Sequence, residues 1–178
     1  MKITYFVHGT TTDNERGIAT GWNPGELSAL GKRQAVELGQ LVKGKTFDVV
    51  FCSDLKRAVD SAELAFGKQA IIDKRLRECD YGDLNGHPEE ELGNKLAHIK
   101  TAFLKGERYS DVEKRMRSFL KDLQKKYAGK HVAIVSHQGP QLALEVIVNG
   151  KTWQQAFAED WRLKKAWRPG WEYLLDEK

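Results

Sequence analysis

Short apolar runs alternate along the chain with segments whose apolar residues recur every three or four positions. The runs are rich in Val, Ile and Phe, which is typical of buried strands, and they occupy residues 3–7, 47–52, 70–72 and 131–135. The helical spacing is found over residues 27–42, 55–66 and 140–147. Because strands alternate with helices, we expect an α/β fold, a three-layer α-β-α sandwich whose mostly parallel sheet has helices on both faces.

Turn-forming residues mark where these elements begin and end. Gly44 and Gly67 follow the first two helical patterns and are expected to end them. Either Ser28 or Glu26 begins the first helix, and Ser53 is the predicted N-cap of the second. Residues 10–25 have no apolar period and are predicted to form a loop, whereas residues 171–175 are predicted to form an edge strand.

The length of 178 residues fits a single domain, residues 1–178. Residues 73–87 are rich in charge and glycine and are predicted to be loop. Two charged helical patterns follow over 88–124, interrupted around Gly106. We expect residues 74–128 to form an insertion, a loop and small helical cap over the sheet.

Composition narrows the classes of protein to consider. Hydrophobic residues make up 40% and charged residues 30%, so the chain can bury a core, and no apolar run approaches the roughly 18 residues of a membrane span. Cys52 and Cys79 are too few for a disulfide framework, and the N-terminus lacks the apolar run of a secretion signal. We therefore expect a cytoplasmic protein. The net charge of +4 permits an anionic ligand.

Polar residues follow three of the predicted strands. His8-Gly9 follows the first, Ser53-Asp54 follows the second with Arg57 one turn on, and 136–139 (Ser-His-Gln-Gly) follow the last of the parallel strands. Ligands of parallel sheets bind beyond the carboxyl ends of the strands, so we expect His8, Arg57 and His137 to share one pocket.

Two histidines and an arginine suit phosphoryl transfer. A neutral imidazole is a nucleophile towards phosphorus, and the guanidinium group matches phosphate oxygens. A second, protonated imidazole can hold the charge that develops on those oxygens. Taken singly, His8 and His137 would more often be structural. His87, His98 and His131 are scattered among charged residues, so we predict no metal site.

Four ordered blocks carry a resemblance to a known family. They are residues 8–11 (His-Gly-Thr-Thr) with Asn14, residues 53–58, residues 76–78 (Leu-Arg-Glu) with Gly82 and Gly86, and residues 136–139. In this order they resemble the histidine phosphatase superfamily, which includes cofactor-dependent phosphoglycerate mutases, fructose-2,6-bisphosphatases and many small phosphatases. The resemblance extends from the first strand to the helix after Gly139.

The resemblance implies a role for each matching residue. His8 corresponds to the nucleophile that becomes phosphohistidine, Arg57 to a phosphate-binding arginine and His137 to the second pocket histidine. Glu78 corresponds to the general acid, which later activates water. The implied substrate-binding residues are Gly9, Thr11, Asn14, Arg57, His137 and Gln138. No metal and no cofactor are implied; the implied ligand is a small phosphorylated substrate or inorganic phosphate.

The sequence departs from the family pattern at two positions. Val7 stands where the family has an arginine before the nucleophile. Losing such a charge-assisted contact costs about 1.5–3 kcal/mol or more, which corresponds to one to three orders of magnitude in rate. Arg16, Arg75 and Arg77 are candidates to lend a guanidinium group instead; otherwise they are surface charges. Gln138 stands where the family usually has glycine, which adds an amide beside His137.

The function predicted first is metal-independent phosphomonoester hydrolysis through a phosphohistidine. The alternative is a catalytically degenerate member that binds phosphate or a partner; Val7 supports it, and the presence of His8, Arg57, Glu78 and His137 argues against it. A phosphoglycerate mutase is less favoured because the chain is short. Nucleic-acid binding is less favoured too, because aromatic residues in such a run more often pack against the domain. That run consists of Arg162, Lys164, Lys165 and Arg168 interleaved with Trp161, Trp167 and Trp171.

Overall fold

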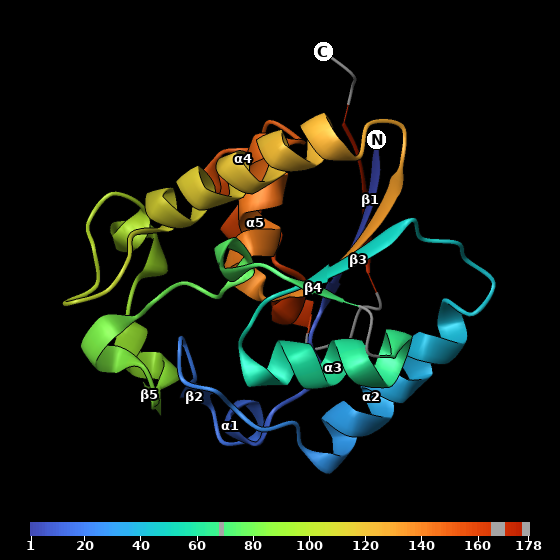
Figure 1. The fold of residues 1–178 in the computed structure, drawn as a ribbon. Coiled ribbons are helices and arrows are strands. Elements are labelled where there is room, and N and C mark those ends of the chain that lie inside the picture. The colour runs from blue at the N-terminus through green and yellow to red at the C-terminus, as the bar shows by residue number, and fades with distance from the viewer. Residues whose placement is uncertain (68–69, 165–169, 176–178) are drawn as a thin grey trace.

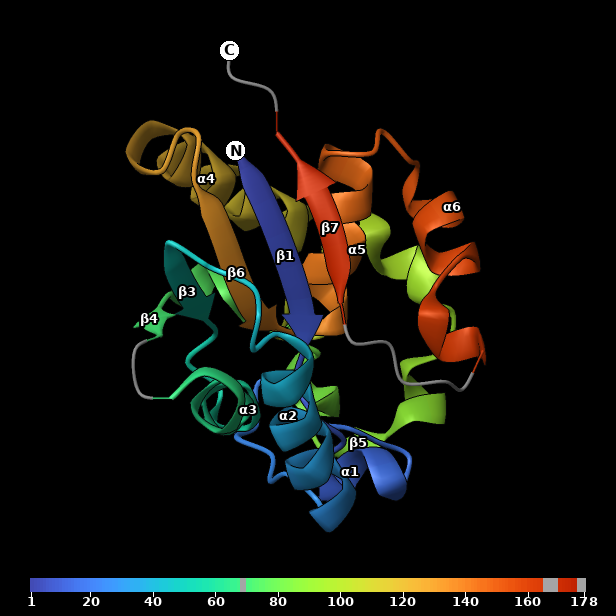
Figure 2. The same cartoon turned by 90° about the vertical axis from the view of Figure 1, so that its right-hand side faces the viewer.

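A five-stranded sheet forms the centre of the computed structural model, which describes residues 1–67, 70–164 and 170–175. The strand order is β4-β3-β6-β1-β7. The strands are β1 (Lys2–Val7), β3 (Val49–Cys52), β4 (Ile71–Ile72), β6 (His131–Ser136) and β7 (Trp171–Leu174). The first four run parallel, and β7 lies antiparallel at the edge beside β1. This confirms the predicted mostly parallel sheet and its edge strand (Figures 1 and 2).

The register of β1 against β6 brings their carboxyl ends together. Val7 lies opposite Ser136, and the His8 N–H group donates to the Ser136 carbonyl oxygen at 3.0 Å. On the other side of β6, Cys52 at the end of β3 lies opposite Val135. The chain therefore leaves three neighbouring strands at the same edge of the sheet, as the sequence predicted.

Helices cover both faces of the sheet (Figure 1). On one face lie α2 (Ala29–Leu41) and α3 (Lys56–Phe66), and on the other lie α4 (Tyr109–Lys126), α5 (Gln138–Ile147) and α6 (Trp153–Ala158). Alternate residues of β1 point to opposite faces: Phe6 packs in the core with α2 and α3, whereas Tyr5 and Val7 pack in the larger core with α4 and α5. Each face thus has its own buried core.

The predicted ends of the helices are confirmed in part. The Ser28 side chain accepts a hydrogen bond from the Gly31 N–H group and caps α2, while Gly67 ends α3 with a φ of 77°. The prediction for Ser53 is wrong: α3 begins after Leu55, and the Ser53 hydroxyl accepts from the Leu55 N–H group instead. At the other end of α2, the helix stops at Leu41, before Gly44.

The stretch 10–25 contains two short elements that its lack of period concealed. They are α1 (Thr12–Glu15) and β2 (Ile18–Ala19), and β2 pairs with β5 (His87–Pro88). Thr11 and Asn14 form a capping box at the start of α1, each side chain accepting from the other's backbone N–H group. Elements this short are fixed by caps and tertiary contacts rather than by apolar periodicity.

The stretch predicted as a cap divides into two parts. Its first part consists of short 3₁₀ helices: η1 (Lys74–Leu76), η2 (Gly82–Leu84), η3 (Glu89–Leu92) and η4 (Lys95–Ile99). The first two lie in the stretch predicted as loop, and the last two lie where an α-helical pattern was expected. Its second part, α4, lies beside α5 and buries one face in the larger core. The buried residues of α4 are Tyr109, Val112, Met116, Phe119, Leu120 and Leu123. Helix α4 therefore packs against the sheet beside α5, as part of one helical layer of the sandwich.

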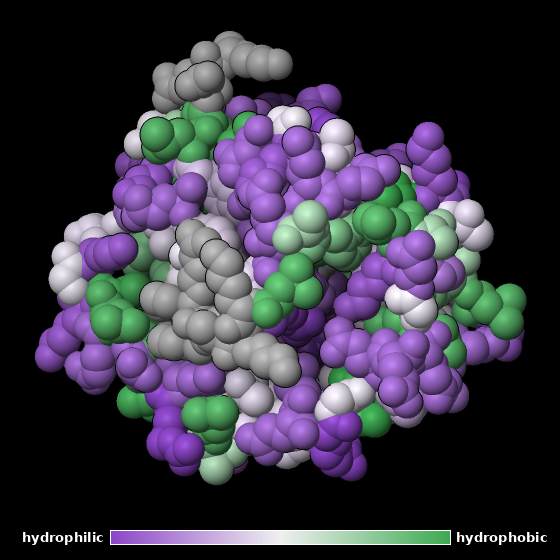
Figure 3. All heavy atoms as spheres, turned by 180° about the vertical axis from the view of Figure 1, so that it is seen from behind, coloured by the Kyte–Doolittle hydropathy of each residue, from purple (hydrophilic) through white to green (hydrophobic). Residues whose placement is uncertain are grey.

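The surface seen from behind is mostly hydrophilic, and its hydrophobic side chains form small scattered patches (Figure 3). Among the described residues, no helix combines the length and the apolar character that spanning a membrane would need.

Candidate functional site

His8 follows β1, and its imidazole is held in one tautomer. Its Nδ1 lies 2.7 Å from the Gly9 carbonyl oxygen, which can only accept a hydrogen bond, so Nδ1 carries the proton. The lone pair is therefore on Nε2, which accepts a hydrogen bond from Arg57 Nε at 3.3 Å. The nitrogen that is free to act as a nucleophile is the one beside the guanidinium group.

Both site histidines are kept neutral. Burial, followed by the positive charge of Arg57, lowers the pKa of His8 well below its usual value. Burial, Arg57 and His8 lower the pKa of His137 in the same way. The sequence suggested that the second imidazole, that of His137, is protonated. In the free protein the lowered pKa favours the neutral form of both imidazoles instead.

His137 is the N-cap residue of α5 and is fully buried. Its ring centroid lies 5.1 Å from that of His8, at an interplanar angle of 60°. Tyr5 fixes its backbone twice, since the hydroxyl donates to the His137 carbonyl oxygen at 2.7 Å and accepts from the His137 N–H group at 3.1 Å. Within the described parts of the chain, neither ring nitrogen has a hydrogen-bond partner. A buried, unpaired imidazole beside His8 is suited to bind a ligand.

Arg57 lies in the first turn of α3, and its guanidinium group is held by a loop of backbone carbonyls. Nη2 donates to the Gly21 oxygen at 2.7 Å, and Nη1 donates to the oxygens of Asn23 and Pro24 at 2.7 and 3.3 Å. Burial lowers the pKa of Arg57 to about 10, so the group stays charged at neutral pH. The charge is fixed next to His8 Nε2.

Glu78 is buried, and its backbone neighbours orient its carboxyl group. Oε1 accepts hydrogen bonds from the N–H groups of Cys79 and Gly139, at 2.8 and 2.9 Å. Two donors already point at Oε1, so Oε2 is the oxygen able to hold a proton. The Glu78 backbone oxygen accepts from Trp22 Nε1 and Arg115 Nη2, each at 2.8 Å. The position of Glu78 is therefore set from both ends.

Two adjoining cavities open at His8. The narrow one, about 30 Å³, is lined by Arg57 and Glu78, and the wider one, about 600 Å³, is lined by Val7 and Gln138. Four residues line both: His8, Asn14, Glu89 and Arg162. The narrow cavity is polar and is lined by two arginines and two glutamates, and the wider cavity adjoins it at His8.

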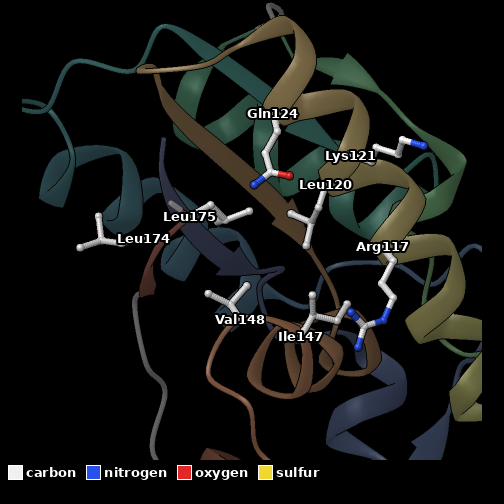
Figure 4. Close-up of a pocket in the computed structure, with 8 residues that line it drawn as sticks. All are labelled: Arg117, Leu120, Lys121, Gln124, Ile147, Val148, Leu174 and Leu175. Carbon is white, nitrogen blue, oxygen red and sulfur yellow. The ribbon is translucent and has the colours of Figure 1, made fainter. Parts of the chain in front are cut away.

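A different pocket, shown in Figure 4, has a volume of about 370 Å³ and lies between α4, α5 and the end of the chain's last strand. Its walls include Leu120, Ile147, Val148 and Leu175, and it shares no lining residue with the cavities at His8. It carries no part of the site described here.

Only some of the predicted substrate-binding residues line the cavities at His8. Asn14 lines both cavities, whereas Thr11 lines neither and its hydroxyl accepts from the Asn14 N–H group. Gly9 contributes its carbonyl oxygen to His8 and its N–H group to the Ser61 hydroxyl. Gln138 is buried at the wall of the wider cavity. The structure thus brings His8, Arg57, Glu78, His137, Asn14 and Gln138 together.

The arginines that the sequence suggested in place of the one missing at Val7 are engaged elsewhere. Arg16 pairs with Asp13 at 2.7 Å, and Arg75 pairs with Asp73 and Asp122. Arg77 pairs with Asp54 at 2.6 Å. None of the three lines either cavity at His8, which favours the other alternative that the sequence left open, namely that they are surface charges.

Sequence reasoning named Arg162 only as part of the C-terminal basic and aromatic run and missed it as a site residue. It lies in η5 (Trp161–Lys164) and lines both cavities. Its Nη1 donates to Gln138 Oε1 at 2.7 Å, and Gln138 Nε2 in turn donates to Asp160 Oδ2. Nothing in local spacing marks Arg162, because it reaches the site through the packing of the C-terminal segment. The only hint in the sequence of a further site residue was that Val7 and Gln138 both depart from the family pattern.

Part of the C-terminal aromatic run packs against the domain. The rings of Trp161 and Trp171 lie 5.8 Å apart, and Trp171 is buried. Lys165, Trp167 and Arg168 lie outside the described residues. Across residues 1–67, 70–164 and 170–175, no group of three or more His, Cys, Asp or Glu side chains is placed to hold a metal ion.

Comparison with known proteins identifies the family of the chain. The family described as "Histidine phosphatase superfamily (branch 1)" matches residues 5–167, which is most of the chain. The chain belongs to this superfamily. Phosphoserine phosphatase 1 of Hydrogenobacter thermophilus is 30% identical over 156 residues, which cover 81% of this chain and 74% of that protein. Adenosylcobalamin/alpha-ribazole phosphatase of Escherichia coli is 29% identical over 151 residues, or 78% and 74% of the two chains.

Solved structures of superfamily members resemble this one over most of its length. The alpha-ribazole phosphatase of Shigella flexneri has a TM-score of 0.76 at 26% identity, covering 89% of this chain and 84% of that one. A mycobacterial glucosyl-3-phosphoglycerate phosphatase bound to VO3 has a TM-score of 0.76 at 28% identity, with coverage of 88% and 86%. By contrast, the chain spans about half the length of a matching 2,3-bisphosphoglycerate-dependent phosphoglycerate mutase from Streptococcus equi, at 35% identity over 111 residues.

Proposed function

We propose that the protein hydrolyses phosphomonoesters through a phosphohistidine at His8, without a metal ion. The observation that carries this proposal is the hydrogen bond from His8 Nδ1 to the Gly9 carbonyl oxygen, which leaves the lone pair on Nε2 beside Arg57. The lowered pKa of His8 keeps that lone pair available at and below neutral pH. Membership of the superfamily supports the same chemistry.

In the first step, His8 Nε2 attacks the phosphorus atom, the N–P bond forms and the P–O bond to the leaving alcohol breaks. The leaving oxygen takes a proton from Glu78 Oε2, so the alcohol departs neutral. Arg57 Nε, which donates to Nε2 in the free site, then donates to a phosphoryl oxygen. The unpaired ring nitrogens of His137 offer a further hydrogen bond to the phosphoryl group.

In the second step, the Glu78 carboxylate takes a proton from a water molecule, whose oxygen attacks phosphorus as the N–P bond breaks. Inorganic phosphate leaves, His8 regains its lone pair and Glu78 is protonated again. The net reaction consumes one phosphomonoester and one water, and yields one alcohol and one phosphate.

The opening above His8 favours small substrates. A cavity of about 600 Å³ lies within the range of small-molecule sites. The relatives are named for phosphoserine and alpha-ribazole, and we propose for this chain a small phosphorylated metabolite of comparable size.

Both cysteines are buried and unpaired, which supports a reducing, cytoplasmic setting.

Hydrolysis of an aryl phosphate in the presence of a metal chelator tests the proposal. We expect turnover by the natural protein and a loss of about a thousandfold or more in His8→Ala, because the nucleophile is removed. Lys121→Ala, at an exposed position on α4, is the control.

A protein that binds phosphate without turnover, and that gains turnover in Val7→Arg, would instead be the catalytically degenerate member. Metal-dependent turnover that survives His8→Ala would contradict the mechanism.

A further inference from the structure

We propose that Arg162 is the second phosphate-binding guanidinium group of this site, admitted by the short side chain of Val7 and aimed by Gln138. The inference rests on the proposed function and goes beyond it, by assigning a catalytic residue to a segment far from the motifs. Arg162 and Val7 line the same wide cavity above His8, and Arg162 also lines the narrow recess with Arg57 and Glu78.

The site needs a cation besides Arg57. Four hydrogen bonds already engage the Arg57 guanidinium group, three of them to backbone carbonyl oxygens, so it has little left to offer a dianion. His8 and His137 are neutral because burial lowers their pKa values. Of the groups named so far, only Arg57 therefore offers a fixed positive charge to a phosphoryl group next to His8.

Arg162 supplies a second charge from the wall. Of the other charged groups at these cavities, Lys95 is paired with Glu89 at 2.9 Å. The Asp160 carboxylate accepts from the Gln138 side chain and from the Arg162 backbone N–H group. For Arg162 itself, no carboxylate lies within ion-pair distance of the guanidinium group in the described parts of the chain. The carboxylate of Glu89 lines both cavities with Arg162, and its ion-pair partner is Lys95.

Gln138 is built to orient Arg162. Its Oε1 accepts from Arg162 Nη1 at 2.7 Å, while its Nε2 donates to Asp160, so both ends of the buried amide are used. Asp160 Oδ1 accepts from the Arg162 N–H group at 3.1 Å and closes the arrangement. A neutral amide fixes the guanidinium group without cancelling its charge. The two departures from the family pattern thus both concern Arg162, because Val7 leaves room for its guanidinium group and Gln138 orients it.

Phosphate affinity is the most direct test, measured as the inhibition constant of inorganic phosphate and of vanadate. We expect Arg162→Ala to weaken binding about 10- to 100-fold and to lower kcat/KM by a similar factor. Arg162→Lys keeps the positive charge but loses the paired N–H donors of the guanidinium group. Its affinity for phosphate is therefore expected to lie between those of the natural protein and Arg162→Ala. Arg117→Ala, which removes an exposed guanidinium group on α4, is the matched control and is expected to bind phosphate normally.

Rescue experiments separate binding from folding. Millimolar guanidinium ion, below denaturing concentration, restores activity to Arg162→Ala and leaves Arg117→Ala unchanged. Val7→Arg raises the activity of Arg162→Ala, because it returns a guanidinium group to the wide cavity that Val7 and Arg162 line. Gln138→Gly weakens phosphate binding less than Arg162→Ala does, because it loosens the guanidinium group without removing it. Each variant's melting temperature is measured without phosphate to confirm that it folds.

The inference is overturned if Arg162→Ala binds phosphate within about twofold of the natural protein, or if its defect resists both guanidinium ion and Val7→Arg. Hydrolysis that depends on His8 but not on Arg162 would overturn this inference alone. Phosphate binding that depends on Arg162 in a protein without turnover would overturn the proposed function and leave this inference standing.

Discussion

The reactive side chains are each held by main-chain groups, some from the next residue and others from distant parts of the chain. Gly9 fixes the tautomer of His8, three carbonyl oxygens hold Arg57, and two N–H groups hold Glu78 Oε1. The strand exits predicted that His8, Arg57 and His137 meet, because these exits share one edge of the sheet, whereas Glu78 was expected there only from the family resemblance. They could not predict these contacts, which depend on how the loops pack.

Gly139 leaves the space that Glu78 occupies. A Cβ at position 139 would lie 2.4 Å from Glu78 Oε1, so the carboxyl group must move in Gly139→Ala. We expect kcat to fall about 10- to 100-fold for alkyl phosphates, whose leaving groups need an acid, and less for aryl phosphates. Steady-state kinetics with both substrates measures the difference.

Gly44→Ala is the control for this substitution, because nothing lies within 4 Å of a Cβ there. Equal losses on alkyl and aryl substrates would show that Glu78 is not the acid for the leaving group.

At the scale of elements, long periodic segments were predictable and short ones were not. The strand β1 and the helices α2 and α3 follow the apolar pattern closely. The 3₁₀ helices and α1 depend on caps and tertiary packing, which leave no period in the sequence. Helix α4 was predicted as a helix, but its charged composition hid how deeply one face is buried.

Because one face of α4 is buried in the larger core, truncating a side chain on that face should lower the free energy of unfolding substantially. Met116 is fully buried in the larger core, so we expect Met116→Ala to lower the free energy of unfolding by about 2–5 kcal/mol. Lys121→Ala, on the exposed side of the same helix, is expected to change it by less than about 0.5 kcal/mol. Urea unfolding measures both. Similar small effects of the two substitutions would mean that α4 is a dispensable cap.

At the scale of the whole molecule, the fold class and the site edge were predictable, while the completing arginine was not. The order of strands and helices was enough for the first two. Arg162 lies 154 positions after His8 in the numbering and reaches it only through the folded C-terminal segment. Charged residues that act through tertiary placement have no local signature.

Two buried neutral histidines make the stability of the free protein depend on pH. Above about pH 6.5 they are neutral in both the folded and the unfolded chain and contribute nothing. As the pH falls below this value, the unfolded chain binds protons that His8 and His137 do not accept in the fold, because their pKa values are lowered there. The free energy of unfolding should then fall by about 1.4 kcal/mol per pH unit for each histidine.

Urea unfolding of the natural protein and of His8→Gln between pH 7.5 and 5 tests this dependence. We expect a shallower slope for the variant, by up to about 1.4 kcal/mol per pH unit, because one buried histidine is gone. Identical slopes would show that His8 titrates in the folded protein as it does in the unfolded chain.

The most direct test of the phosphohistidine is to trap it. Glu78→Gln is mixed with an aryl phosphate, whose leaving group needs no acid, quenched in alkali and analysed by peptide mass spectrometry. Because the variant lacks the base for the second step, we predict that phosphate accumulates on the His8 peptide, is lost in acid, and is absent when His8→Ala is added. Turnover by the natural protein with no phosphate on His8 in either background would contradict the account.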